Sequence, residues 1–338
     1  MWKTLIQAVR KIIAVLSLIL LPIYFLSIFL TVDGYVLAFK SSPPESIFYR
    51  VFYFPMYIGP IPFYIPIYMV YTPRLSELML LLLTIYTICL TSTIFKECNI
   101  LRALKWGVNP FKNAFISTTA LTNASILLIL LIQFIQEKAG IETGEIKAEN
   151  ELLKYISIAL APLIEEIGFR IFLIGIISLI ITIVILGIHN LRIKEIIEFL
   201  LFPRSARKRV YMETGKDSLR IPLILLVIIT SIIFGVIHYL YGGGWEIGKI
   251  STATIAGLLL GYLYVVFGID ASILSHYTFN HFLMTYYYIS RVNKLVGLID
   301  FIILVQGFIA IIYGIIIIIV RGWENEVSIN GPSSVSEV

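Results

Sequence analysis

The chain has 338 residues, of which 59% are hydrophobic and 14% charged, and its formal net charge is +5. This composition excludes both an ordinary soluble globular protein and a disordered chain. The basic residues lie mostly in short segments between apolar runs, as topology determinants do, so the positive charge does not indicate a nucleic-acid partner. We therefore predict an all-α, polytopic membrane protein that is surrounded by the lipid bilayer.

Eight apolar runs have the length of about 18 residues or more that a membrane-spanning helix requires. They cover residues 12–31, 76–96, 113–136, 152–189, 221–241, 250–268, 271–290 and 298–320. The first run follows Lys3, Arg10 and Lys11 and has no small-residue cleavage pattern behind it. We expect it to be a retained helix rather than a signal peptide.

Residues 47–71 form a ninth apolar stretch of a different kind. The stretch is rich in aromatic residues and contains four prolines, Pro55, Pro60, Pro62 and Pro66. Proline removes a helical hydrogen bond and clashes with the preceding turn, so this density of prolines excludes an unbroken helix. We expect the stretch to lie in the membrane interface or to re-enter the membrane.

Residues 191–220 form the most basic connection in the chain. They contain Arg192, Lys194, Arg204, Arg207, Lys208, Arg209, Lys216 and Arg220. Positively charged connections stay in the cytoplasm, so with eight spans both termini are predicted to be cytoplasmic, with the protein in the cell membrane. The apolar positions of residues 193–202 favour an anchor on the membrane surface, with substrate recruitment as the alternative.

The chain divides into four predicted parts. Residues 1–150 hold the N-terminal helices and the interfacial stretch, 151–290 a helical core, 291–320 the last spanning helix, and 321–338 a polar, disordered tail. The two cysteines, Cys89 and Cys98, have neither disulfide nor zinc spacing. Nothing in the sequence predicts the oligomeric state.

Three charges interrupt the apolar run 152–189, at Glu165, Glu166 and Arg170. A charge at the centre of a bilayer costs at least about 2.5 to 3.5 kcal/mol, so the group indicates a polar interior site. Glu166 and Arg170 are spaced i, i+4 and share a helix face, where they can form a supporting ion pair. Glu165 points elsewhere and is left as the more reactive carboxylate, a candidate general base.

Two later spans repeat the i, i+4 spacing. Phe234 and His238 form one pair, and His276 and Asn280 form the other. A carboxylate and an imidazole can deprotonate a water, while a second imidazole and an amide can donate hydrogen bonds to an oxyanion. The pattern therefore predicts hydrolysis. Upright helices would place His238 and His276 toward opposite membrane faces, so we expect tilted or broken helices, or a dip of residues 241–244 into the membrane.

These three motifs, in this order on successive apolar segments, closely resemble the CPBP intramembrane protease family, which includes the Rce1-type CAAX prenyl endopeptidases and the Abi proteins. The resemblance covers roughly residues 151–290 and implies a glutamate protease that uses neither metal nor cofactor. It implies that Glu165 activates water with help from His238, and that His276 and Asn280 stabilise the oxyanion.

The same resemblance implies supporting roles for Glu166, Arg170 and Phe234. In the Rce1 branch the substrate is a prenylated protein that is cut after its lipidated cysteine, which releases the last three residues. The expected partner is therefore a prenylated or membrane-associated protein or peptide.

Four alternatives remain open. A non-catalytic immunity or scaffolding protein could share the fold, because fold does not establish activity. A zinc protease could use Glu165, His238 and His276 as ligands, although the sequence has no HExxH helix. Ser272 or Ser275 could act as a nucleophile, although no base oriented by a third group accompanies them. A transporter would also carry intramembrane Glu and His, but the paired broken helices of transporters are missing from the sequence.

Overall fold

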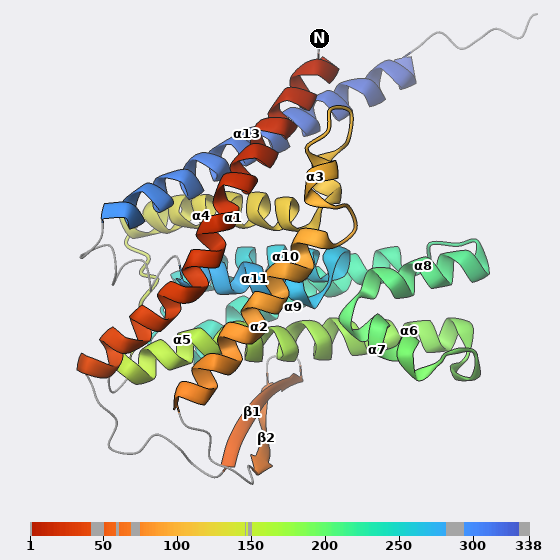
Figure 1. Cartoon of the computed structure of the whole chain (residues 1–338). Coiled ribbons are helices and arrows are strands. Elements are labelled where there is room, and N and C mark those ends of the chain that lie inside the picture. Colours follow the sequence, from red (N-terminus) through yellow and green to blue (C-terminus); the bar gives the residue numbers. More distant parts are fainter. Residues whose placement is uncertain are drawn as a thin grey trace, which may run out of the picture.

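The computed structural model describes residues 2–41, 51–58, 61–68, 75–145, 147, 151–281 and 294–330. The helices are α1 (Trp2–Ser41), α2 (Leu75–Phe95), α3 (Ile100–Ala103), α4 (Ala114–Lys138), α5 (Glu151–Glu166), α6 (Ile176–Leu186), α7 (Ile193–Leu201), α8 (Pro203–Thr214), α9 (Arg220–Tyr241), α10 (Gly248–Phe267), α11 (Ile269–Asn280) and α13 (Lys294–Asn330). Short 3-10 turns lie at η1 (Pro110–Lys112) and η3 (Ile188–Asn190), and a π-helix, η2, covers Ile167–Gly175. The prediction of an all-α polytopic membrane protein is confirmed (Figure 1).

Within the described residues, seven helical segments are long and apolar enough to cross a membrane. They correspond to seven of the eight predicted spans. The remaining span, predicted at 271–290, begins as α11, and its second half lies outside the described residues. Helix α13 continues to Asn330, so the prediction that a disordered tail begins at residue 321 is wrong. Gly331 and Pro332, residues typical of the end of a helix, follow in the sequence.

The proline-rich stretch contains a β-hairpin, which the sequence reading did not foresee. Strand β1 (Val51–Ile58) pairs antiparallel with β2 (Ile61–Tyr68), with Val51 opposite Tyr68 and Ile58 opposite Ile61. Proline cannot donate to a strand ladder, but it is tolerated on edge strands, and a two-stranded ribbon has only edge strands. The backbone of β1 lies against η2, so the hairpin borders the first motif (Figure 1).

Helix α11 lies at the centre of the bundle. It contacts α2, α4, α5 and α10, and its residues from Asp270 to Phe279 are buried. At its start, Lys96 forms an ion pair with Asp270 at 2.7 Å and lies 3.8 Å from the centroid of the Phe202 ring. These contacts tie α2 and the basic segment to the start of α11.

Helices α9 and α10 are packed closely along their length. A Cβ atom on Gly257 would lie 3.0 Å from the Cα atom of Ser231, and one on Gly235 would clash with the carbonyl of Ile250. Small residues allow this backbone approach, as in other membrane helix pairs. The packing sets the register of α9 against α10, which in turn sets the height of the histidine on α9.

Candidate active site

The first motif spans the end of α5 and the start of η2. Glu166 and Arg170 are both completely buried, and the Arg170 Nε donates to the Glu166 Oε2 at 3.0 Å. The ion pair expected from the i, i+4 spacing is therefore present. It lies in a chain segment of high hydropathy, where each charge needs the other because an isolated buried charge is costly.

The helix changes its winding directly after the two glutamates. Residues 167–175 form a π-helix, and at its end the Ile176 N–H bonds to the Ile171 carbonyl, five residues back. The wider turn changes the direction in which successive side chains point relative to an α-helix, and such segments often occur at functional sites. Here it follows Glu165 and Glu166 and contains Arg170.

Glu166 is the centre of a polar network that joins two helices. Its Oε2 accepts from Arg170 and from the hydroxyl of Ser272, and its Oε1 lies 2.8 Å from the His276 Nδ1. Because a carboxylate only accepts, the His276 Nδ1 must carry hydrogen. Glu166 therefore fixes the orientation of the His276 ring as well as pairing with Arg170.

Phe234 covers the buried guanidinium. The Arg170 Cζ lies 5.2 Å from the centroid of the Phe234 ring, within the range of a cation–π contact. Phe234 also packs edge-on against His238, with 4.4 Å between ring centroids. Its ring thus links the ion pair of the first motif with the histidine of the second.

Both histidines present the same nitrogen to Glu165. The His238 Nδ1 lies 2.8 Å from the Phe234 carbonyl and must donate to it, which leaves the His238 Nε2 facing the Glu165 Oε2 at 3.8 Å. The His276 Nε2 lies 3.7 Å from the same oxygen. Among the described residues, this oxygen has no hydrogen-bond partner. Three proton-exchanging groups therefore converge on one point.

The two histidines meet without a broken helix. Helix α9 continues unbroken to Tyr241, and α11 returns antiparallel to α10 after the Gly268 turn, which places Ser272 beside the Leu260 carbonyl at 2.9 Å. This register raises His276 to the level of the Phe234–His238 turn, with 6.1 Å between the Phe234 and His276 rings. Of the expected arrangements, a break in α9 is therefore not needed for this meeting.

A short ribbon of irregular backbone closes the space above the histidines. The Glu145 and Lys147 N–H groups donate to the carbonyls of Gly244 and Gly243, and the Glu246 N–H donates to the Thr143 carbonyl at 2.9 Å. The glycine segment pairs its backbone with the α4–α5 connection. These bonds satisfy backbone groups that would be costly to bury alone.

A cavity of about 250 Å³ lies between this ribbon and the histidines. His238, His276 and Asn280 line it together with Lys249 and Trp245. The Asn280 Nδ2 donates to the Ile158 carbonyl at 3.1 Å, which uses one of its two amide hydrogens. The cavity therefore brings the second and third motifs to one space, with one Asn280 N–H still available.

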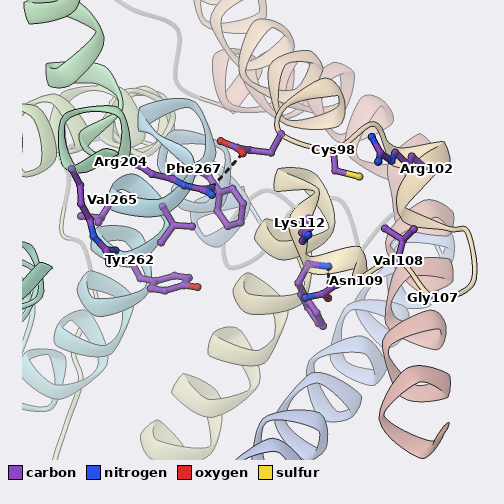
Figure 2. Close-up of a pocket in the computed structure, with 14 residues that line it drawn as sticks. Cys98, Arg102, Gly107, Val108, Asn109, Lys112, Arg204, Tyr262, Val265 and Phe267 are labelled. Carbon is purple, nitrogen blue, oxygen red and sulfur yellow. Dashed lines mark hydrogen bonds and ion pairs between the residues drawn. The ribbon is translucent and has the colours of Figure 1, made fainter. Parts of the chain in front are cut away.

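A larger cavity of about 910 Å³ lies at the other end of α10, away from the histidines. Figure 2 shows Arg102, Lys112 and Cys98 on one side of it and Arg204 and Tyr262 on the other. Its polar groups are those of the basic connections and include no residue of the three motifs. It is a feature of the opposite membrane boundary.

Sequence reasoning missed two polar residues of the site. Ser272 was considered only as a possible nucleophile, yet its hydroxyl donates to Glu166 on another helix. Its spacing of four residues from His276, and of eight from Asn280, was a usable signal, because all three share one helix face. Lys249 lines the cavity, but in the sequence it looks like any lysine that marks a membrane boundary.

Among the residues that the structure describes, no group of three or more His, Cys, Asp or Glu side chains is arranged to hold a metal ion. The geometry thus gives the zinc alternative no support.

A multi-pass helical bundle with a partly exposed carboxylate, Glu165, between two imidazoles defines the class, a membrane protein with a hydrolase-type site. Residues 150–282 match the family model described as Type II CAAX prenyl endopeptidase Rce1-like. The matched segment, about two fifths of the chain, contains all three motifs, so the resemblance seen in the sequence is confirmed. At the level of this family, the match supports a protease. No curated protein and no solved structure matches the chain.

Proposed function

We propose that the protein is an intramembrane endopeptidase in which Glu165 and His238 activate a water that attacks a peptide carbonyl. One observation carries the proposal: Glu165 directs an oxygen without a hydrogen-bond partner among the described residues toward the Nε2 atoms of His238 and His276, 3.8 and 3.7 Å away. Both distances exceed a direct hydrogen bond, so the three groups surround a position for a reacting molecule.

The proposed reaction needs no covalent intermediate. The water oxygen bonds to the carbonyl carbon while its proton passes to Glu165 or His238. The free Asn280 N–H then donates to the oxyanion, and so does the His276 Nε2 when the ring carries a second proton, as an imidazolium paired with Glu166. Collapse of the tetrahedral intermediate breaks the carbon–nitrogen bond, and the proton held by the base goes to the leaving amine. Glu166, Arg170 and Ser272 hold His276 in place throughout.

We further propose that the substrate is a prenylated CAAX-type chain from which the last three residues are removed. Two features support this. The segment that holds the site matches the Rce1-like family model. The site also lies among membrane-spanning helices, where an isoprenoid anchor that already lies in the bilayer would arrive from the side.

Mass spectrometry of products from purified protein tests the proposal. Farnesylated and unprenylated CAAX peptides are each incubated with the wild type and with Glu165→Gln, which keeps the shape of the side chain but removes the base. The wild type should release a C-terminal tripeptide, and the variant should be slower by about 10²- to 10⁴-fold.

Glu137→Gln, an exposed carboxylate on α4, is the matched control and should cleave at the wild-type rate. Equal cleavage by wild type and a folded Glu165→Gln protein would contradict the mechanism. Absence of cleavage in the wild type would favour the non-catalytic immunity or scaffolding alternative.

A further inference from the structure

Lys249 is a cation inside the proposed catalytic cavity. It is the second residue of α10 and lines the same space as His238, His276 and Asn280. Apart from the two histidines, it is the one basic side chain among the described residues that line this cavity. Its charge also lies close enough to Glu165 and His238 to interact with both.

The Lys249 ammonium has an aromatic neighbour but no ion-pair partner among the described residues. Its Nζ lies 3.6 Å from the centroid of the Trp245 ring, a cation–π contact. No carboxylate of the described part of the chain lies within 4.0 Å of it, in contrast to Lys96 and its partner Asp270. Glu145 lines the same cavity and Glu165 lies near enough to interact, but neither forms an ion pair with Lys249, so the ammonium retains the capacity to bind an anion.

The position of Lys249 is fixed by the backbone around it. The Gly248 N–H donates to the Glu142 carbonyl at 2.9 Å, and the Lys249 N–H donates to the Glu246 carbonyl at 2.9 Å. A Cβ on Gly248 would lie 2.7 Å from that Glu142 carbonyl oxygen, so the contact depends on glycine at this position. The start of α10 is therefore held at one place against the α4–α5 connection.

A lysine at a membrane boundary commonly extends its ammonium into water. Lys138, at the end of α4, behaves in this way: it is exposed and makes only a distant contact with Phe134, at 5.6 Å. Lys249 is instead half-buried and lies over Trp245 inside the cavity. The two lysines therefore differ in surroundings although both stand at the ends of spanning helices.

We propose that Lys249 binds the C-terminal carboxylate of the peptide substrate and so restricts cleavage to bonds near a chain end. The inference rests on the proposed function and adds a carboxylate subsite to it. In a chain cut three residues from its end, the carboxylate lies roughly 10 Å from the scissile carbonyl. Lys249 would then set the distance from the chain end at which Glu165 acts.

The test compares two farnesylated peptides of identical sequence, one ending in a free carboxylate and the other in an amide. The wild type should cleave the acid with a kcat/KM about 10- to 100-fold above that of the amide, as expected for loss of a hydrogen bond between two charged groups. Lys249→Met should bring this ratio close to one, and Lys249→Arg should keep most of it. Lys138→Met, the matched control, should retain the full wild-type ratio.

The outcomes separate the two proposals. If the wild type cleaves neither peptide, the proposed function fails. If it cleaves acid and amide equally, or if Lys249→Met keeps the wild-type ratio, the protease stands and the carboxylate subsite is overturned. If Lys249→Met does not fold, equal cleavage of acid and amide by the wild type still overturns the carboxylate subsite.

Discussion

The buried ion pair of the first motif gives the sharpest stability prediction. Arg170 and Glu166 have no exposed side-chain surface, and the guanidinium supplies one of the donors to the Glu166 Oε2. Arg170→Met keeps the volume of the side chain but leaves Glu166 charged and buried, with Ser272 and His276 as its remaining partners. Breaking a buried pair by removing one partner costs about 3 to 5 kcal/mol of unfolding free energy.

A second substitution separates the cost of the unpaired Glu166 charge from the other effects of removing Arg170. In Arg170→Met/Glu166→Gln the uncompensated carboxylate is replaced by a neutral amide, which can still bond Ser272 and His276. Because the buried site then holds no unpaired charge, the double variant should be more stable than Arg170→Met alone. Reversible unfolding by SDS in mixed micelles, followed by circular dichroism, measures all the variants.

The control is Arg204→Met, which breaks an exposed ion pair with Glu97, 3.4 Å in length. Such pairs contribute about 0 to 1 kcal/mol, so this variant should stay near the wild type. The reasoning is refuted if Arg170→Met unfolds with a free energy within about 0.5 kcal/mol of the wild type. It is equally refuted if the double variant is no more stable than the single one.

Three further outcomes are expected. Gly268 has a φ of 99° and a ψ of −179°, a region essentially restricted to glycine, and a Cβ atom there would meet the Phe202 ring. Gly268→Ala should therefore lower the free energy of unfolding by about 1 to 3 kcal/mol or more in the same titration. The hydrogen bond from Arg207 lowers the pKa of Asp217, so the stability difference between wild type and Asp217→Asn should be full above about pH 4 and shrink as the pH falls further. Peptide cleavage should persist after prolonged exposure to a strong chelator, whereas loss of activity that zinc restores would favour the zinc alternative.

Local spacing predicted the contacts that lie within one helix. The Glu166–Arg170 pair and the shared face of His276 and Asn280 follow from the i, i+4 rule, since neighbours on a helix are set by its pitch. The contact between Glu166 and His276 joins residues 110 positions apart and depends on how α5, α10 and α11 pack. No single-sequence pattern encodes that packing.

Two other features depended on competing local preferences. The prolines of residues 47–71 correctly excluded a helix, but they are compatible with a loop, a re-entrant segment or a hairpin, and the structure forms the hairpin. The winding change after Glu166 has no residue signature in Ile167–Gly175, a run without proline, so an α-helix was the natural expectation. In both cases the sequence limited the options without selecting among them.

Helix α10 separates two chemical environments. At about 1.5 Å per residue its 20 residues extend roughly 30 Å, the thickness of the hydrocarbon layer. Lys249 near its start faces the small cavity, and Phe267 at its end lines the large basic one beside Cys98. The proposed catalytic cavity and the basic segment therefore lie toward opposite ends of α10.

The free thiol of Cys98 can report this direction, since it is partly exposed while Cys89 is buried. An impermeant maleimide that labels inverted vesicles but not intact cells would place the basic segment in the cytoplasm, as the charge distribution predicts. The cavity lined by His238 and Lys249, at the other end of α10, would then lie toward the outer surface.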